Sequence, residues 1–293
     1  MTNIQSFQRY IGLSTDTKPT GVNAGSEFIE KDTQEKYIFD NSSWERTADN
    51  YPYEISIGEG LRTNHRTWYK LGFSASITTT PEDIWEVGGL YTFATSAGKL
   101  EVISDNAADS SVGAGARTVE IHYLTSSFDE KSEIVTLTGA SAVETASSDF
   151  YRVNYFKVLT TGSTPNAVGN IDIRATADTP IYSRIAAGTT RSRDSVFTVP
   201  KDNSLYISQI DYGAEHTAAN KFSLITLRGK YDFIDSVTSN LFYPEATALL
   251  DNGTIPVHYD VPLKFPAGTD MKMTASSNGT AAINVALRGW LES

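Results

Sequence analysis

The amino-acid sequence predicts an all-β protein built from antiparallel β-sandwich modules of the jelly-roll type, with an extended N-terminal arm or hairpin and one short helix. Between Lys99 and Ala175, apolar side chains alternate with polar ones in short runs, and Gly-, Asn- or Ser-rich breaks separate these runs. The same alternation returns between residues 197 and 287. A period of two is typical of half-buried antiparallel strands, and strands spaced about 8–12 residues apart without helical crossovers favour a sandwich over an α/β fold.

The length of the chain allows more than one β module. At 293 residues it exceeds the roughly 100–150 residues of a common single domain. A Thr-, Ala- and Arg-rich stretch at residues 176–195 interrupts the strand pattern. We therefore expect three parts: an N-terminal attachment arm or hairpin at residues 1–50, a first β-sandwich module at 51–175 and a second at 176–293.

The composition narrows the classes of partner. The formal net charge is −11, which disfavours binding to nucleic acid because phosphates need Lys and Arg as counter-charges. Cysteine is absent, so neither disulfides nor thiolate metal sites are available. The first ten residues contain no apolar signal segment, and no apolar run approaches the ~20 residues that span a bilayer. We expect a soluble protein made in the cytoplasm, with no nucleic acid and no membrane among its partners.

Two short strands are predicted near the N-terminus. Residues 25–32 and 35–40 have strand-like patterns and are joined by a turn at 32–34, and the segment ends at Trp44. A hairpin of this size buries too little apolar surface to be stable alone. Its aromatic residues are therefore our candidate interface and attachment residues: Phe28, Tyr37, Phe39 and Trp44.

One short helix is predicted to start at Thr80. Thr80 is a suitable N-cap, Pro81 fits the first helical position, and Glu82 and Asp83 place acids in the first turn. Two glycines at 88–89 would end this helix within two turns. We expect Trp85 to lie in the core rather than to stack on a ligand.

Several motifs carry a resemblance to known proteins. The segment from Leu13 to Trp44 contains, in order, the patterns Thr-Lys-Pro, Gly-Ser-x-Phe, Asp-Thr, Tyr-Ile-Phe and Asn-x-x-Trp. It resembles the small N-terminal module that is common in tailed-phage virion proteins.

A longer resemblance extends from Pro81 to the C-terminus. It rests on six motifs, at residues 81–91, 102–109, 113–119, 133–139, 151–154 and 197–200. Together they resemble a widespread group of uncharacterised phage structural proteins. The resemblance implies membership of a virion and supplies no catalytic residues to carry over.

Residue types that carry chemistry are present but scattered. His65, His122, His216 and His258 have no paired spacing, so no zinc site is predicted. No nucleophile elbow or phosphate-binding loop occurs in the sequence, and Gly113-Ala-Gly115 is best interpreted as a tight turn before a strand that begins at Thr118. We predict no catalytic residue, no cofactor and no metal.

The segment Asp105-Asn-Ala-Ala-Asp109 resembles the start of a calcium-binding loop. The glycine and glutamate that an EF-hand loop needs at its sixth and twelfth positions are replaced by Ser110 and Ala116. We therefore expect these side chains to close turns through the backbone. A looser calcium site on this loop stays open as an alternative.

These observations lead to three alternative functions. The first is a non-enzymatic structural protein of a tailed-phage virion, synthesised in the host cytoplasm. It would be a capsid decoration, cement or head-fibre protein that forms homo-oligomers, with a trimer expected, and contacts other virion proteins such as the major capsid protein. The second is a tail-associated receptor-binding protein or tailspike that recognises host surface polysaccharide. The third is an intracellular β-sandwich binding module with no role in a virion.

Overall fold

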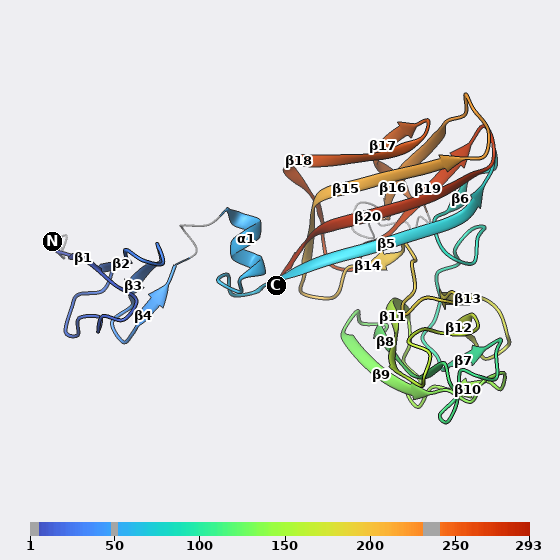
Figure 1. Ribbon diagram of the computed structural model, residues 1–293, viewed down its shortest axis with the longest axis horizontal. Helices are drawn as coiled ribbons and strands as arrows, with labels where there is room; N and C mark the ends of the chain where they lie inside the picture. Colours follow the sequence, from blue (N-terminus) through green and yellow to red (C-terminus); the bar gives the residue numbers. More distant parts are fainter. Residues whose placement is uncertain (1–5, 48–51, 231–240) are drawn as a thin grey trace. The chain divides into compact units, whose positions relative to one another are not determined.

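The computed structural model describes residues 6–47, 52–230 and 241–293, and it confirms the all-β prediction (Figure 1). Strands dominate these residues, and the one helix recorded among them is α1, at Tyr53–Gly58. None of the helical structure described is long and apolar enough to cross a membrane. The chain divides into two compact units, residues 1–67 and residues 68–293.

The first unit contains a small sheet with the strand order β1-β2-β3-β4. The strands are β1 Arg9–Gly12, β2 Glu27–Glu30, β3 Lys36–Phe39 and β4 Trp44–Arg46. The predicted hairpin is confirmed as β2 and β3, which pair antiparallel. Two more strands flank the hairpin: β1 runs parallel to β2, and β4 runs antiparallel to β3. The additional strands give the hairpin a core of its own.

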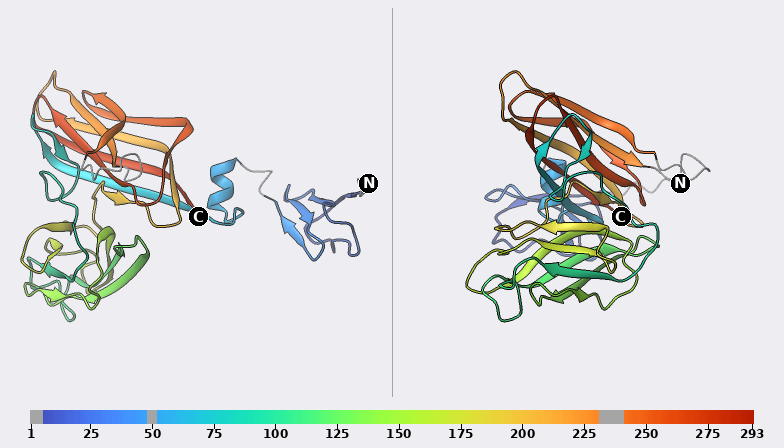
Figure 2. Two further views of the ribbon diagram at one scale, coloured as in Figure 1. Left: turned by 180° about the vertical axis from the view of Figure 1, so that it is seen from behind. Right: turned by 90° about the vertical axis from the view of Figure 1, so that its right-hand side faces the viewer.

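The second unit contains two β-sandwiches. In the first, which we call the sandwich module, the sheets have the strand orders β18-β15-β20-β5 and β14-β19-β16-β17, and β6 pairs with β19 (Figures 1 and 2). Its strands are β5 His65–Ile77, β6 Glu82–Asp83, β14 Phe197–Thr198, β15 Ser204–His216, β16 Ser223–Lys230, β17 Tyr243–Leu250, β18 Gly253–Phe265, β19 Asp270–Ser277 and β20 Ala281–Glu292. Side chains from both sheets form one hydrophobic core.

The second sandwich, which we call the inserted module, lies between β6 and β14 in the chain. Its sheets have the orders β10-β7-β12-β13 and β11-β8-β9. The strands are β7 Leu100–Ser104, β8 Ala116–Leu124, β9 Glu130–Thr136, β10 Val143–Glu144, β11 Arg152–Thr161, β12 Ile171–Ala175 and β13 Ile181–Ile185. The alternating residues Val119, Ile121 and Tyr123 are all buried in its separate core, as their period predicts.

The sheets divide the chain differently from a boundary at residue 176. That position falls between β12 and β13, which pair with each other in one sheet. The strands β5 and β6, from the first half of the chain, pair with β20 and β19 near the C-terminus. Both ends of the inserted module are held on the same strand, because β6 and β14 each pair with β19.

The helix predicted at Thr80 is wrong. Glu82 and Asp83 form strand β6 instead, and Asp83 is fully buried. Its carboxylate accepts a hydrogen bond from the backbone N–H of Tyr91 at 2.6 Å and pairs with Lys272 at 2.9 Å. These long-range contacts override the local helix-start signals, since propensity is only a weak preference. Trp85 lies in the core, 4% exposed, as predicted.

A buried polar junction joins the two modules of the second unit. Arg152, at the start of β11, forms an ion pair with Asp270, at the start of β19, and also donates to the carbonyl of Ala94 at 2.8 Å. Beside this pair, Asn154 exchanges two hydrogen bonds with the backbone of Thr198, each at 2.9 Å. The inserted module is thus attached by specific hydrogen bonds to β14 and β19 of the sandwich module.

Candidate functional site

The four predicted interface residues lie together in the first unit and form its core. Trp44 contacts the rings of Phe28 and Phe39 at centroid distances of 6.0 and 5.4 Å. Lys18 places its ammonium 3.9 Å from the ring centre of Tyr37. Phe28 is only 3% exposed and the other three are half-buried. Phe28, Phe39 and Trp44 pack on one another and Tyr37 packs on Lys18, so all four side chains stabilise the small sheet.

A different set of apolar side chains is exposed in this unit. Ile11 is 59% exposed on β1, Phe7 just before the strand is 67% exposed, and Leu13 just after it is 47% exposed. Ile11 shares its face of β1 with Arg9, which pairs with Glu27 at 2.7 Å, whereas Phe7 and Leu13 flank the strand. We call these three residues the β1 stripe. Because β1 is the terminal strand of its sheet, the stripe lies along an open edge.

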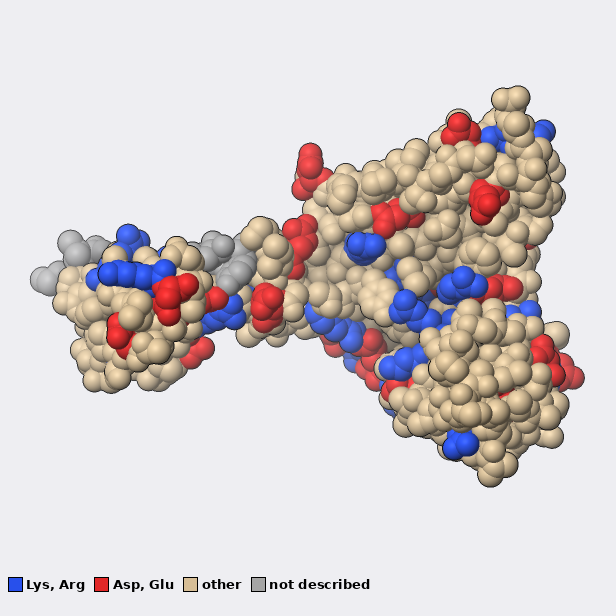
Figure 3. Space-filling view, in the orientation of Figure 1, with Lys and Arg blue, Asp and Glu red and all other residues tan. Residues whose placement is uncertain are grey.

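In the second unit, an open edge of the sandwich module exposes apolar side chains. The terminal strands β17 and β18 belong to different sheets and follow each other in the chain. Val257, Tyr259 and Leu263 on β18 pack against the core but stay half-exposed, whereas the core-facing residues of β17 are the small Ala246 and Ala248. On the outer face of β17, Leu249 is 60% exposed. Ile255, the partner of buried Tyr212, is 48% exposed. We call the surface along β17 and β18 the open edge; in Figure 3 this upper rim of the body is mostly uncharged.

The predicted turn at Asp105–Asp109 is present and is built around a buried carboxylate. Asp109 is fully buried, and its two oxygens accept hydrogen bonds from the backbone N–H groups of Ala116, Val168 and Gly169 and from the hydroxyl of Ser104, at 2.8–2.9 Å. These donors occupy the lone pairs that a calcium ion would use. In the described part of the chain, no group of three or more acidic or histidine side chains is placed to hold a metal ion.

Two glycines lie close to the carboxylates of this turn. A Cβ at Gly115 would lie 2.1 Å from an oxygen of Asp109, and a Cβ at Gly169 would lie 2.1 Å from an oxygen of Asp105. Only glycine lets the backbone approach these carboxylates so closely. The 102–109 and 113–119 motifs therefore form one structural unit, in which a tight turn precedes strand β8.

One histidine belongs to a chain of polar side chains that sequence reasoning missed. The imidazole of His216 contacts Ser223 through Nε2 at 3.0 Å and Asn252 through Nδ1 at 3.2 Å. The order hydroxyl, imidazole, amide resembles the arrangement of a nucleophile, its base and an orienting group. However, Ser223 is fully buried, so no substrate reaches its oxygen. These hydrogen bonds instead connect the turn between β17 and β18, which contains Asn252, to His216 at the end of β15.

The other histidines lie apart from one another. His65 contacts the hydroxyl of Tyr53 at 2.8 Å, His122 lies 3.3 Å from the carboxylate of Glu120, and His258 is exposed on β18. The structure therefore does not bring the four predicted histidines together in one site.

Two buried ionisable residues lie close to the junction of the modules. Burial lowers the pKa of Lys70 to about 8, although the negative charge of Asp194 opposes this shift. Burial raises the pKa of Asp194 to about 6, with the charge of Lys70 acting in the opposite direction. Lys70 donates to the carbonyl of Asn154, and Ser183 donates to Asp194. Each group therefore has hydrogen-bonding partners from the inserted module or its C-terminal connection.

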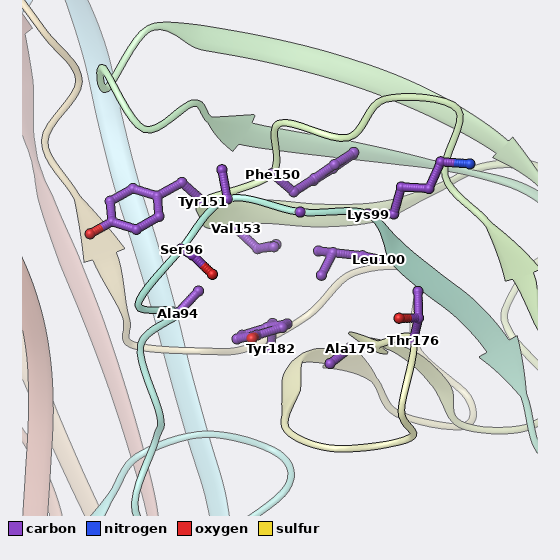
Figure 4. Close-up of a pocket in the computed structure, with 12 residues that line it drawn as sticks. Ala94, Ser96, Lys99, Leu100, Phe150, Tyr151, Val153, Ala175, Thr176 and Tyr182 are labelled. Carbon is purple, nitrogen blue, oxygen red and sulfur yellow. The ribbon is translucent and has the colours of Figure 1, made fainter.

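A cavity of about 160 Å³ opens in the inserted module, with walls from three separate segments (Figure 4). Leu100, Phe150 and Val153 form an apolar floor and are all buried. The ring of Tyr182 faces this floor from the opposite side, and Ser96 lies at the rim (Figure 4). No local sequence pattern marks this cavity, because its lining comes from residues 94–100, 150–153 and 175–182.

Comparisons with known proteins add little to this geometry. No protein-family model matches the chain, and no curated protein matches it. A solved structure titled "Structure of infectious bursal disease virus Gt strain" aligns with 82% of this chain and 76% of that chain at 9% identity. The TM-score is 0.13, a similarity too low to support a conclusion about fold or function.

Proposed function

We propose that this chain is a non-enzymatic structural protein of a tailed-phage particle, which attaches through its first unit and associates with copies of itself through its second unit. Its expected location is the capsid surface, where it would act as a decoration, cement or head-fibre protein. One observation supports the association: within the described residues, each unit has terminal strands with no further strand beside them, and exposed apolar side chains lie on these strands. Such edges are ready to pair or pack with another chain, and soluble proteins normally protect them.

Attachment is assigned to the β1 stripe rather than to the four aromatic residues of the core. Phe7, Ile11 and Leu13 offer apolar contact area on the terminal strand, where the sheet can be extended or covered by a virion protein. The core residues hold the small sheet together and thereby fix the direction of this strand.

Self-association is assigned to the open edge, with a second copy of this chain as its occupant. Homo-oligomers with closed symmetry are the commonest soluble assemblies, and each copy carries the same half-exposed row on β18. Pro256 and Pro262 lie on β18 and Pro244 on β17, and a proline cannot donate a backbone hydrogen bond. We therefore expect side-chain packing rather than an open-ended extension of the sheet.

The experiment that tests the location is a peptide map of purified particles from a phage that encodes this chain, combined with surface labelling of intact particles. Peptides of this chain in the particle, labelled on the outside of the head, are the expected result. Absence from particles would overturn the proposal. Presence on the tail, together with depolymerisation of host polysaccharide, would favour a tailspike instead.

A second experiment tests the open edge through the oligomeric state of the purified full chain. Analytical ultracentrifugation should show a homo-oligomer, with a trimer expected, that dissociates when Ile255→Asp and Leu249→Asp are combined. Ile134→Asp is the matched control, because Ile134 is 57% exposed on another terminal strand, β9. A monomeric wild-type chain, or equal dissociation by the control, would contradict self-association through this edge.

A further inference from the structure

We propose that the cavity in the inserted module binds one neutral pyranose ring, either as a free sugar or as the end of a glycan. This binding site is independent of the assembly surfaces, because its lining belongs to the inserted module and its entry segment, whereas the open edge belongs to β17 and β18.

The size of the cavity limits the ligand to a single ring. Its volume is about 160 Å³. An apolar cavity of ~150 Å³ accepts a benzene-sized molecule, whereas pockets for drug-sized ligands occupy about 300–1,000 Å³. The ring atoms of a pyranose therefore fit, but a hexopyranose has about twice as many heavy atoms as benzene. Its exocyclic groups, and any further units of a glycan, would have to extend out of the mouth into solvent.

The lining combines an apolar floor with hydroxyl groups. Leu100, Phe150 and Val153 present carbon atoms at the bottom of the cavity. Around them lie the side-chain hydroxyls of Ser96, Thr176 and Tyr182 (Figure 4). A pyranose has the complementary pattern, because its ring carbons carry an apolar face of C–H groups while its edge carries hydroxyls that both donate and accept.

The three hydroxyls are available to a ligand. Among the described residues, the side chains of Ser96, Thr176 and Tyr182 make no hydrogen bond to protein. Burial raises the pKa of the Tyr182 phenol, so it stays protonated at neutral pH and can donate. A ligand without hydrogen-bonding groups would separate these hydroxyls from water without replacing the lost hydrogen bonds, which disfavours a purely apolar ring.

The charges around the cavity favour a neutral ligand. Among the side chains that the structure describes, no acidic one lines it, and the one lining cation is Lys99. The ammonium of Lys99 lies 3.2 Å from the carboxylate of Glu144, and Figure 4 shows it directed away from the cavity. A charged sugar would therefore lack a counter-charge within the cavity.

The test is a titration of the full chain with methyl glycosides of glucose, galactose, mannose and N-acetylglucosamine. Saturation-transfer NMR monitors binding. At least one glycoside should bind with a Kd of about 0.1–10 mM, the range expected for a single ring with few hydrogen bonds. Tyr182→Phe, which removes only the hydroxyl, should raise this Kd about five- to tenfold. Ala175→Leu, which fills the cavity from its wall, should abolish binding.

Controls separate the cavity from folding and from assembly. Tyr243→Phe removes a hydroxyl from a 41% exposed tyrosine on β17 and should leave the Kd unchanged. Thr176→Val tests a rim hydroxyl with little change in volume, in case Ala175→Leu fails to fold. The oligomeric state should be the same in all these variants, so failure of sugar binding and failure of the assembly role are distinguishable.

A glycan array with the full chain distinguishes the two sources of the ring. Array binding that Ala175→Leu removes would identify the end of a glycan, and glycoside binding without array binding would identify a free sugar. Either result supports a pyranose site. The proposal is overturned if no glycoside and no array glycan binds saturably, if Ala175→Leu binds as well as wild type, or if para-cresol binds the cavity and the sugars do not.

Discussion

Arg152 of the inserted module and Asp270 of the sandwich module form a bidentate ion pair. Both N–O distances are 2.8 Å, and both residues are less than 10% exposed. The guanidinium also lies 3.9 Å from the ring of Tyr151, and Thr198 donates a hydrogen bond to the carboxylate at 2.5 Å. Burial disfavours the charge of Arg152, but its bonds to Asp270 more than compensate, so its pKa is raised. Every oxygen of the pair is therefore occupied across the junction of two modules.

Removing one member of this pair should destabilise the second unit strongly. Arg152→Met leaves Asp270 charged and buried without its partner, which typically costs about 3–5 kcal/mol. The double variant Arg152→Met/Asp270→Leu should lose less than the sum of the two single changes, because it leaves no unpaired charge. Urea denaturation measures the free energy of unfolding of the single and double variants. The control is the pair of Arg288, whose side chain is 60% exposed, and Asp211, 3.3 Å away. Arg288→Met should cost less than about 1 kcal/mol.

The buried carboxylate of Asp109 should be essential to the turn before β8. Asp109→Asn replaces one acceptor oxygen by a donor that faces backbone N–H groups, and we expect a loss of about 2–3 kcal/mol in the free energy of unfolding. Asp105→Asn should cost much less, because Asp105 is exposed. Neither calcium nor a chelator should change the melting temperature. A melting temperature that rises with calcium in wild type but not in Asp109→Asn would contradict the structural role.

The stability of the second unit should depend on pH in two windows. The pKa of Asp194 is raised from 3.8 to about 6, so the folded state binds more protons than the unfolded state between these values, and stability should fall as the pH rises from about 4 to 6. The pKa of Lys70 is lowered from 10.5 to about 8, so stability should rise as the pH increases from about 8 to 10.5. Denaturation curves across the pH range measure both slopes.

Single variants assign these two windows. Asp194→Asn should remove the fall between pH 4 and 6, and Lys70→Met should remove the rise above pH 8. Lys99→Met is the control, since the side chain of Lys99 is 46% exposed and its removal should alter neither slope. If both slopes persist in the variants, groups other than these two are responsible.

The first unit should unfold locally when its aromatic core is truncated. Trp44 contacts Tyr10, Phe28 and Phe39, and its indole N–H donates to the carbonyl of Pro19 at 2.8 Å. Trp44→Ala should cost about 3–5 kcal/mol, more than so small a sheet can lose. Hydrogen exchange followed by mass spectrometry should show lost protection in β2 and β3 and unchanged protection in β15 and β20.

Substitutions in the β1 stripe should leave the first unit folded but abolish its attachment to particles. Ile11→Asp changes a 59% exposed side chain, so protection in β2 and β3 should be retained while co-sedimentation with particles is lost. Ile55→Asp, at a 51% exposed position on α1, is the control and should still co-sediment. Retained co-sedimentation of Ile11→Asp would place the attachment surface elsewhere.

The strands could be predicted from the sequence because their signal is local. In the inserted module, the alternation at Val119, Ile121 and Tyr123 coincides with the buried face of β8. The start of a helix at Thr80 failed for the converse reason: the burial of Asp83 against Lys272 depends on a residue 189 positions away. Local capping signals contain no information about such a partner.

The arrangement of modules and sites depends on contacts between distant segments. Nothing near β5 indicates that it pairs with β20, so order along the chain suggested a division at 176 that the sheets do not follow. Aromatic residues such as Trp44 attract attention as interface candidates, but exposure distinguishes the core from the surface only once the strands are placed. The cavity in the inserted module likewise forms only when three separate segments are brought together.

The position of the inserted module on β19 has a consequence for how such proteins can change. Its entry strand β6 and its exit strand β14 are held by neighbouring stretches of one strand, with Asp83 opposite Thr274 and Phe197 opposite Met271. The entry and the exit of the segment therefore lie side by side on the scaffold, and any exchanged segment would have to supply new partners for Asp270 and Thr198, which bond to Arg152 and Asn154.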